Sequence, residues 1–439
     1  MKKTAFFAKA AVALILASSL FFGCTKKTEV TQDNESVPKI ERGESFKDEY
    51  TLSKVVVLSR HNIRSPLSDG SSMLAKVTPH EWFNWPSRAS ELSLRGGVLE
   101  TIMGQYFRKW LESENLIPEN YIPKDGEVRF YANSMQRTIA TAQYFSSGML
   151  PVANVVIEHR YAPSKMDAVF TPQTVHLYEG FEAAAMEQIN SLYGKASLAE
   201  LCETLKPAYE VLEKVLDFEK SEYAQANGFP HFKTDDTEVF FKEMAEPSMK
   251  GSLKLATSAS DALVLQYYEE SDDKKAAFGH DISRADWEKI ASIKDMYGDV
   301  LFTAPVVAKE VARPLLKEIA KELGAAERKF TFLCGHDSNV ASVLAALDVK
   351  DYSLPAAIEK KTPIGVKLVF EVWKDKNDAE FVALNLVYQT TEQLRSCQML
   401  SLQEPPAKYE VFLNGLEQNE SGLYQMNEVL GRFEEAEKQ

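Results

Sequence analysis

The stretch VVVLSRHNIRSP, residues 55–66, is the most informative part of this chain. Three valines and a leucine predict a buried β-strand, and Arg60, His61 and Arg64 follow directly after it. Cationic side chains gathered this closely repel one another unless an anion neutralises them. The end of this strand therefore predicts an anion-binding site.

The charge of the 439-residue chain limits the kind of anion. A formal net charge of -14 argues against a nucleic-acid partner, which requires a broad basic face. An acidic protein can still bind a small anion if it gathers its cations locally. We therefore expect a small-molecule ligand and no nucleic acid, whereas the sequence leaves the oligomeric state open.

Residues 1–24 have the form of an export signal. Two lysines precede a short apolar run that ends in Gly23 and Cys24, and the run is too short to span a membrane. Its end resembles the lipobox of bacterial lipoproteins, in which Cys24 would carry the lipid; the alternative is a plain secretory signal. We expect export to the periplasm or cell envelope, a membrane anchor at Cys24, and a polar linker over residues 25–48.

The remaining cysteines and the histidines show no pattern of a disulfide framework or a metal site. Cys202, Cys334 and Cys397 are odd in number, so they cannot all pair within the chain. Cys334 lies in the apolar run FTFLC and is expected to be a buried free thiol, while pairing of Cys202 with Cys397 stays open. No Cys/His spacing is typical of a metal site, so we expect no metal and no cofactor.

Strand and helix patterns alternate along most of the chain. Runs at 128–131 and 330–333 are rich in β-forming residues and, like the first strand, precede helical patterns. Two later runs, 365–373 and 381–389, predict a hairpin at the edge of the sheet. This order predicts an α/β fold with a doubly wound, mostly parallel sheet.

One long segment interrupts this alternation. Residues 167–302 are rich in helical patterns and contain no clear strand, which predicts an inserted α-helical cap. The α/β core domain would then consist of residues 49–166 and 303–439.

Polar side chains follow three predicted strands, at the edge where open α/β sheets bind ligands. They are Arg60, His61 and Arg64 after the first strand, Arg137 one helical turn after the second, and His336 and Asp337 after the third. Guanidinium groups match phosphate oxygens, an imidazole can accept a phosphoryl group, and a carboxylic acid can protonate a leaving alkoxide. A structural histidine and an N-capping aspartate are the ordinary alternatives. Together the residues predict phosphoryl transfer at acidic pH, because Asp337 must carry a proton.

These motifs resemble those of the histidine acid phosphatases. SRHNIRSPL resembles the Arg-His-Gly-x-Arg-x-Pro signature, CGHDSNVASVLAAL the C-terminal His-Asp motif, and YANSMQRTIATAQYF the segment that supplies a third arginine. Within that family, the sequence most resembles the glucose-1-phosphatase branch. The resemblance extends from about residue 55 to 403. It implies an α/β core with an inserted α cap and no metal.

The resemblance also implies a role for each matching residue. His61 would be the nucleophile that forms a phosphohistidine, and Asp337 would be the proton donor. The phosphate would be bound by Arg60, Arg64, Arg137 and His336. Asn62, where most members have glycine, would bear on substrate choice. Glu246, in EMAEPSMKGSLK, matches a cap residue that faces the substrate entrance; the alternative is a surface carboxylate on an acidic helix.

We therefore expect an exported acid phosphatase that hydrolyses phosphate monoesters, with sugar phosphates such as glucose 1-phosphate as substrates. A phytase-like inositol-phosphate phosphatase is the alternative, and the negative net charge disfavours it mildly. A lipoprotein that only binds phosphate esters is a third hypothesis, but such a protein needs neither His61 nor Asp337. A phosphoglycerate-mutase-like transfer enzyme fits an exported chain poorly.

Overall fold

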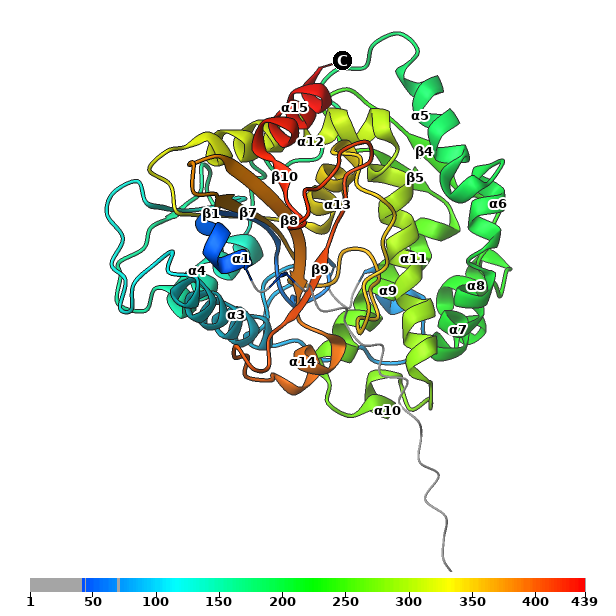
Figure 1. Cartoon of the computed structure of the whole chain (residues 1–439). Helices are drawn as coiled ribbons and strands as arrows, with labels where there is room; N and C mark the ends of the chain where they lie inside the picture. The colour runs from blue at the N-terminus through cyan, green and yellow to red at the C-terminus, as the bar shows by residue number, and fades with distance from the viewer. Residues whose placement is uncertain (1–41, 44, 69–71, 439) are drawn as a thin grey trace, which may run out of the picture. The chain divides into compact units, whose positions relative to one another are not determined.

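The computed structural model describes residues 42–43, 45–68 and 72–438 (Figure 1). The predicted signal peptide, Cys24 and most of the predicted linker lie outside these residues. Within the described part of the chain, no helix combines the length and the hydrophobicity needed to cross a bilayer.

A mixed sheet of eight strands forms the centre of the described chain (Figure 1). The strand order is β10-β8-β7-β1-β6-β2-β3, with β9 also paired to β8. The neighbours β1, β6, β2 and β3 run parallel, whereas β7, β8, β9 and β10 add an antiparallel half. The strands are β1 (Thr51–Arg60), β2 (Val128–Ala132), β3 (Ile157–Glu158), β6 (Phe330–Gly335), β7 (Lys367–Lys374), β8 (Glu380–Tyr388), β9 (Ala407–Glu410) and β10 (Tyr424–Gln425).

Helices cover both faces of this sheet, as the alternation of side chains along β1 requires. Val55 and Val57 pack in an apolar cluster with α3 (Leu94–Ser113) and α4 (Gln136–Met149). Val56 and Leu58 point to the other face and pack with α12, α13 and α15. These helices are α12 (Pro305–Gly324), α13 (Asp337–Ala346) and α15 (Met426–Glu437). Because β1 is buried on both sides, its sequence contains a continuous hydrophobic run.

The predicted α/β fold class is confirmed, with two differences in the sheet: it is mixed rather than mostly parallel, and the predicted edge hairpin lies inside it. The hairpin β7-β8 forms as predicted but does not lie at the edge, because β7 pairs with β1 and β8 continues to β9 and β10. Local patterns predict which strands form a hairpin, but the neighbours beyond the hairpin depend on tertiary packing. Short helices α1 (Phe46–Glu49), α2 (Met73–Lys76) and α14 (Thr391–Ser396) complete this part of the fold.

The segment predicted as a cap is mainly helical. Its helices are α5 (Phe181–Asn190), α6 (Leu198–Glu203), α7 (Lys206–Leu216), α8 (Glu222–Asn227), α9 (Ser252–Glu269), α10 (Asp273–Ala276) and α11 (Arg284–Phe302), with short 3₁₀ turns at Leu192–Gly194 and Phe218–Lys220. It also contains a short antiparallel hairpin, β4 (Glu238–Phe240) with β5 (Ser248–Lys250), so the expectation of no strands was wrong in this detail. The limits of the cap at 167 and 302 remain a prediction.

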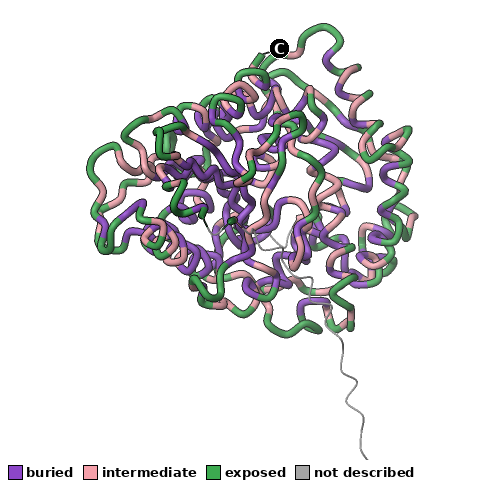
Figure 2. Tube along the Cα trace, in the orientation of Figure 1, coloured by how far each residue is buried: buried purple, intermediate pink, exposed green. Residues whose placement is uncertain are grey.

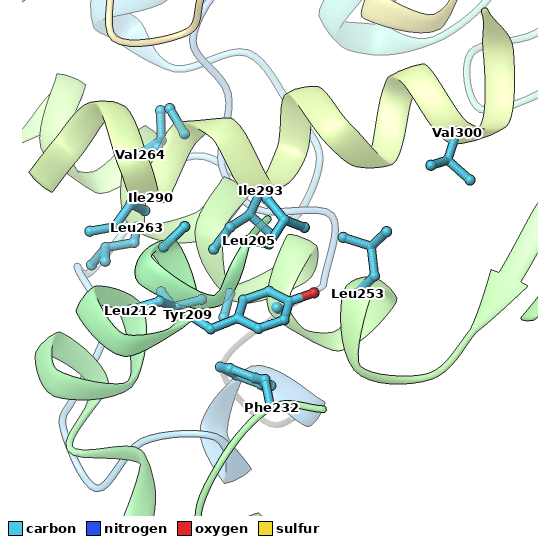
Figure 3. Packing of buried hydrophobic residues seen from close by; sticks show 14 of the residues in the cluster. Leu205, Tyr209, Leu212, Phe232, Leu253, Leu263, Val264, Ile290, Ile293 and Val300 are labelled. Carbon is cyan, nitrogen blue, oxygen red and sulfur yellow. The ribbon is translucent and has the colours of Figure 1, made fainter. Parts of the chain in front are cut away.

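One apolar cluster holds this helical segment together (Figure 3). Tyr209 and Leu212 of α7 pack with Leu263 of α9 and Ile290 of α11. The same cluster includes Ile63, two residues after His61, so the end of β1 is anchored to the helices above it.

Burial follows the sheet and the inner faces of the helices (Figure 2). Cys334, on β6, is a buried free thiol as predicted. Cys202 and Cys397 are also free in the structure.

Candidate active site

The six predicted site residues gather at the carboxyl ends of three parallel strands. Arg60 ends β1, His336 and Asp337 follow β6, and Arg137 lies in the first turn of α4 after β2. Since β1 and β2 both pair with β6, their carboxyl ends lie at the same edge of the sheet. A cavity of about 700 Å³ opens there, and its lining includes His61, Arg64, Arg137, His336 and Asp337.

His61 is held in a single tautomer. Its ring Nδ1 lies 2.9 Å from the carbonyl oxygen of Asn62, which can only accept a hydrogen bond. The proton of the neutral ring is therefore on Nδ1, and Nε2 keeps its lone pair. Burial, followed by the charges of Arg137 and Arg64, holds the pKa of His61 well below its usual value. His61 is thus an uncharged potential nucleophile even in acid.

The Asn62 side chain lies in a buried polar cluster. Its side-chain amide donates to Glu100 Oε1 at 2.8 Å, and Lys367 Nζ lies 3.0 Å from the same oxygen. Asn62 Oδ1 accepts from the backbone N–H of Ile63 at 2.8 Å. Asn62 is absent from the cavity lining, so the structure places it as a support of the His61 loop and not as a contact for substrate.

The three arginines differ in how their charges are balanced. Arg60 Nη1 donates to Glu359 Oε1 at 2.7 Å, and Arg60 Nη2 lies 3.6 Å from Asp337 Oδ2. Arg64 Nη2 pairs with Asp261 of α9 at 2.9 Å. Among the described residues, no carboxylate lies within salt-bridge distance of Arg137; burial, then the nearby Arg64, lowers its pKa to about 10.

All three guanidinium groups retain donor capacity. The Nε atoms of Arg60, Arg64 and Arg137 are buried and have no hydrogen-bond partner in the described chain. A buried donor without a partner costs free energy, roughly 1–3 kcal/mol each, unless a ligand accepts its hydrogen bond. Arg60 differs from the other two because it does not line the cavity but lies behind Asp337. The arrangement can bind a small oxyanion.

His336 is oriented by Asn133, a residue in the turn after β2. The Asn133 side-chain nitrogen lies 2.7 Å from His336 Nε2, and Asn133 Oδ1 already accepts from the backbone N–H of Asp167 at 2.8 Å. Nδ1 lies 3.4 Å from Arg137 Nη2, which can only donate, so a donor faces each ring nitrogen of His336. Burial and the charge of Arg137 hold the pKa of His336 well below its usual value.

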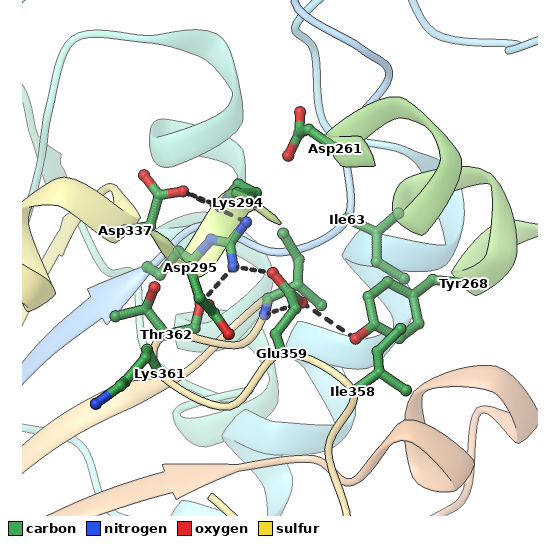
Figure 4. A network of polar contacts seen from close by, with 12 residues as sticks. Ile63, Asp261, Tyr268, Lys294, Asp295, Asp337, Ile358, Glu359, Lys361 and Thr362 are labelled. Carbon is green, nitrogen blue, oxygen red and sulfur yellow. Dashed lines mark hydrogen bonds and ion pairs between the residues drawn. The ribbon is translucent and has the colours of Figure 1, made fainter. Parts of the chain in front are cut away.

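Asp337 is held by a lysine from the helical segment (Figure 4). Its Oδ2 forms a short ion pair with Lys294 Nζ of α11, and its Oδ1 accepts from the backbone N–H of Ser338 at 2.9 Å. Burial raises the pKa of Asp337, but Lys294 and Arg60 outweigh burial and hold that pKa well below its usual value. The carboxyl of Asp337 is one-third exposed toward solvent, so a ligand can reach it.

A buried network fixes Arg60 and thereby Asp337 (Figure 4). Glu359 accepts from Arg60 through Oε1, and its Oε2 accepts from the Tyr268 hydroxyl at 3.1 Å and from the backbone N–H of Ile364 at 3.0 Å. Burial opposes the charge of Arg60, yet Glu359 and Asp337 raise its pKa. Arg60 therefore stays charged beside the aspartate.

Glu246 lies in a loop before β5 and not on an acidic helix. It is exposed and lines the same cavity as His61 and Asp337. Desolvation on the cavity side, and then the charge of Asp337, raises the pKa of Glu246. The role predicted for Glu246 at the substrate entrance stays a prediction, but its position is compatible with that role.

No local signal in the sequence points to Lys294, Asn133, Asp261 or Glu359. Asp261 and Lys294 come from the helical segment, Glu359 from a loop before β7, and Asn133 from an ordinary turn. Each becomes identifiable only through the predicted site residue that it contacts.

The family model described as the histidine phosphatase superfamily (branch 2) matches residues 51–387. A glucose-1-phosphatase of Providencia rettgeri is 38% identical over 361 residues, covering 81% of this chain and 84% of that protein. A glucose-1-phosphatase of Salmonella typhimurium is 36% identical over 378 residues, covering 85% and 90%. The solved phytase of Citrobacter braakii has a TM-score of 0.81 at 26% identity, covering 89% of this chain and 98% of that structure.

Proposed function

The chain belongs to the histidine phosphatase superfamily (branch 2) and is a phosphatase, and from this premise we propose that it hydrolyses sugar phosphates through a phosphohistidine on His61. The arrangement of side chains around the cavity supports this proposal. An uncharged imidazole, two cavity-lining arginines and a carboxyl group surround one cavity, and buried guanidinium donors there have no partner among the described residues. A dianionic phosphate supplies the acceptors that these donors lack.

In the first step, His61 Nε2 attacks phosphorus as the bond to the leaving sugar oxygen breaks. Arg64, Arg137 and His336 bind the phosphate oxygens and stabilise the charge that develops on them. Asp337 transfers its proton to the leaving oxygen, so that an alcohol departs rather than an alkoxide.

In the second step, water attacks phosphorus and the bond to His61 Nε2 breaks. The carboxylate of Asp337 takes the proton of that water, which returns Asp337 to its acid form and releases inorganic phosphate. The low pKa of His61 suits a nucleophile that must be uncharged. Lys294 and Arg60 hold the pKa of Asp337 well below its usual value, so the proton-donor role requires the bound phosphate dianion to raise that pKa.

The rest of the cavity lining favours a sugar over a highly phosphorylated ring. Beyond the arginines, carboxylates offset the lysines, and tyrosine rings lie among them; the lining includes Glu246, Asp295, Asp299, Asp351, Lys254, Lys350, Lys361, Tyr193, Tyr297 and Tyr352. Carboxylates and aromatic rings suit neutral hydroxyl groups, whereas further phosphates would meet carboxylates as well as lysines. We propose that Glu246 contacts the sugar. The phytase relatives support inositol phosphates as the alternative substrate.

A substrate panel tests this proposal. We expect kcat/KM at acidic pH to be much higher for glucose 1-phosphate than for inositol hexakisphosphate. Glu246→Gln should lower the ratio of kcat/KM for glucose 1-phosphate to kcat/KM for inositol hexakisphosphate, because it removes a charge that repels the additional phosphates. A preference for the hexakisphosphate in the wild type would favour the phytase-like alternative, and absence of phosphate release from every ester would reject catalysis.

Arg137→Ala should lower kcat/KM by roughly 10²-fold or more, because it removes a charged donor from the transition state. Arg137 has no carboxylate partner in the described chain, so its loss leaves no buried carboxylate unpaired, and the melting temperature should not fall. Arg160→Ala is the matched control, since Arg160 is half-exposed and does not line the cavity. Unchanged turnover in Arg137→Ala would show that Arg137 does not contribute to catalysis.

Lys294→Met should move the pH profile of kcat to higher pH. Lys294 lowers the pKa of Asp337, so removing this lysine raises that pKa and the proton donor stays protonated over a wider range. The falling alkaline limb should therefore shift upward for glucose 1-phosphate. Lys254→Met is the control, because Lys254 lines the same cavity and has no ion pair with Asp337. A downward shift would contradict the role of Lys294.

We propose that the protein is exported and attached to a membrane through Cys24, on the strength of its N-terminal sequence. Cys24→Ser should move the protein from the membrane fraction to the soluble fraction. If both forms fractionate alike, the anchor is absent.

A further inference from the structure

Two histidines and an aspartate meet where the loop after α2 contacts the helical segment, outside the lining of the phosphate-binding cavity. His80 lies in the loop after α2, Asp217 directly follows α7, and His280 follows α10. One potential ligand atom from each residue lies within 4.8 Å of the other two. His80 Nε2 is 2.8 Å and His280 Nε2 is 3.5 Å from the same oxygen, Asp217 Oδ2.

These separations are close to those of a bound metal ion. Zinc binds imidazole nitrogen and carboxylate oxygen at about 2.0–2.2 Å, so neighbouring ligand atoms in a tetrahedral site lie about 3.3 Å apart. The two observed separations, 2.8 and 3.5 Å, lie on either side of that value. Small rotations of the side chains would therefore suffice to admit the ion.

The three segments are held in place by contacts other than the cluster itself. Thr78 Oγ1 donates to the carbonyl oxygen of Leu216 at 2.7 Å, which ties the His80 loop to the end of α7 beside Asp217. The His80 ring stacks on Phe278 with centroids 5.0 Å apart and an interplanar angle of 15°. Phe278 lies two residues before His280, so one ring contact aligns both histidines. A site built in this way is largely preformed.

One carboxylate oxygen of Asp217 faces both histidines. Asp217 Oδ1 accepts from Lys220 at 2.8 Å, whereas Oδ2 lies nearest to the two imidazole nitrogens. Both histidine rings remain about a quarter exposed, which gives an ion a path from solvent.

We propose that His80 Nε2, Asp217 Oδ2 and His280 Nε2 bind a divalent transition-metal ion, zinc above all, with water in the fourth position. Imidazole and carboxylate ligands are the types that zinc prefers. The ion would connect the His80 loop, the end of α7 and the loop after α10. It would thereby stabilise the helical segment without taking part in phosphate hydrolysis.

Calorimetric titration of the metal-free full chain with zinc chloride tests the proposal. We expect one saturable site in the micromolar range or tighter, and a melting temperature that rises with zinc. His80→Asn and His280→Asn should each weaken binding by about 100-fold or more. His231→Asn is the matched control, because His231 is an exposed histidine of the same segment that pairs with Glu213 but does not belong to the cluster.

Turnover of p-nitrophenyl phosphate confirms that each variant is folded, since none of these residues lines the phosphate-binding cavity. Anomalous scattering at the zinc edge should place the ion among the three side chains. Absence of one-to-one binding in the wild type would overturn the proposal. Equal affinity in the wild type and in the folded His80→Asn and His280→Asn variants would do so as well.

Discussion

His61→Ala should reduce hydrolysis of every phosphate monoester by roughly 10⁴-fold or more, as removal of a catalytic nucleophile does. The structure gives the reason, because Asn62 holds the proton on Nδ1 and leaves the Nε2 lone pair as the one uncharged nucleophile proposed for this site. Alanine also removes a buried ring that contacts His336, with centroids 5.5 Å apart, so circular dichroism and a melting curve must accompany the kinetics.

Trapping the intermediate makes this prediction specific to covalent catalysis. Wild-type protein quenched with base during turnover of a ³²P-labelled ester should carry acid-labile label, and His61→Ala should carry none. His336→Ala is an informative comparison, because it removes the second imidazole of the site without removing the proposed nucleophile. If the His61→Ala variant still became labelled, another residue would have to be the nucleophile.

Asp337→Asn should lower kcat for glucose 1-phosphate by roughly 10²–10⁴-fold, because asparagine cannot supply the proton that the leaving sugar oxygen needs. The effect on p-nitrophenyl phosphate should be much smaller, since its phenolate leaves without a proton. The ratio between the two substrates is therefore the measurement that distinguishes a proton donor from a merely structural aspartate.

The substitution also changes the charge balance of the site. Lys294 and Arg60 lose a carboxylate partner, so some loss of stability is expected and must be measured separately. A second variant, Asp337→Asn combined with Lys294→Met, removes both members of the pair and should recover stability but not turnover of glucose 1-phosphate. Equal slowing of both substrates would contradict the proton-donor role.

The sequence predicted most of the sheet and the grouping of the site residues. The buried pattern of β1 and the motifs after β1, β2 and β6 sufficed, because parallel strands end at a common edge wherever the chain goes between them. The sequence predicted the sheet less well where the position of a strand depends on which strands it pairs with. The hairpin β7-β8 lies inside the sheet rather than at its edge, and the hairpin β4-β5 was not recognised, since three-residue strands carry little periodic signal.

Asn62 shows a further limit of the sequence within the site. The resemblance implied a role in substrate choice, which stays a prediction, and only the structure shows that the Asn62 side chain donates to Glu100. Sequence position shows that a residue is near a site, but not which side of the backbone its side chain takes.

By itself the sequence determined which chemical groups would be brought together, because the strand patterns and the polar residues that follow each strand are local features of the chain. Only the tertiary structure decided their charge states and tautomers. Arg64 is neutralised by Asp261 and Asp337 by Lys294, while Arg137 has no carboxylate partner in the part of the chain that the structure describes. These partners lie on helices far away in sequence, and electrostatic interactions depend on distance in space and on burial, which no local pattern encodes.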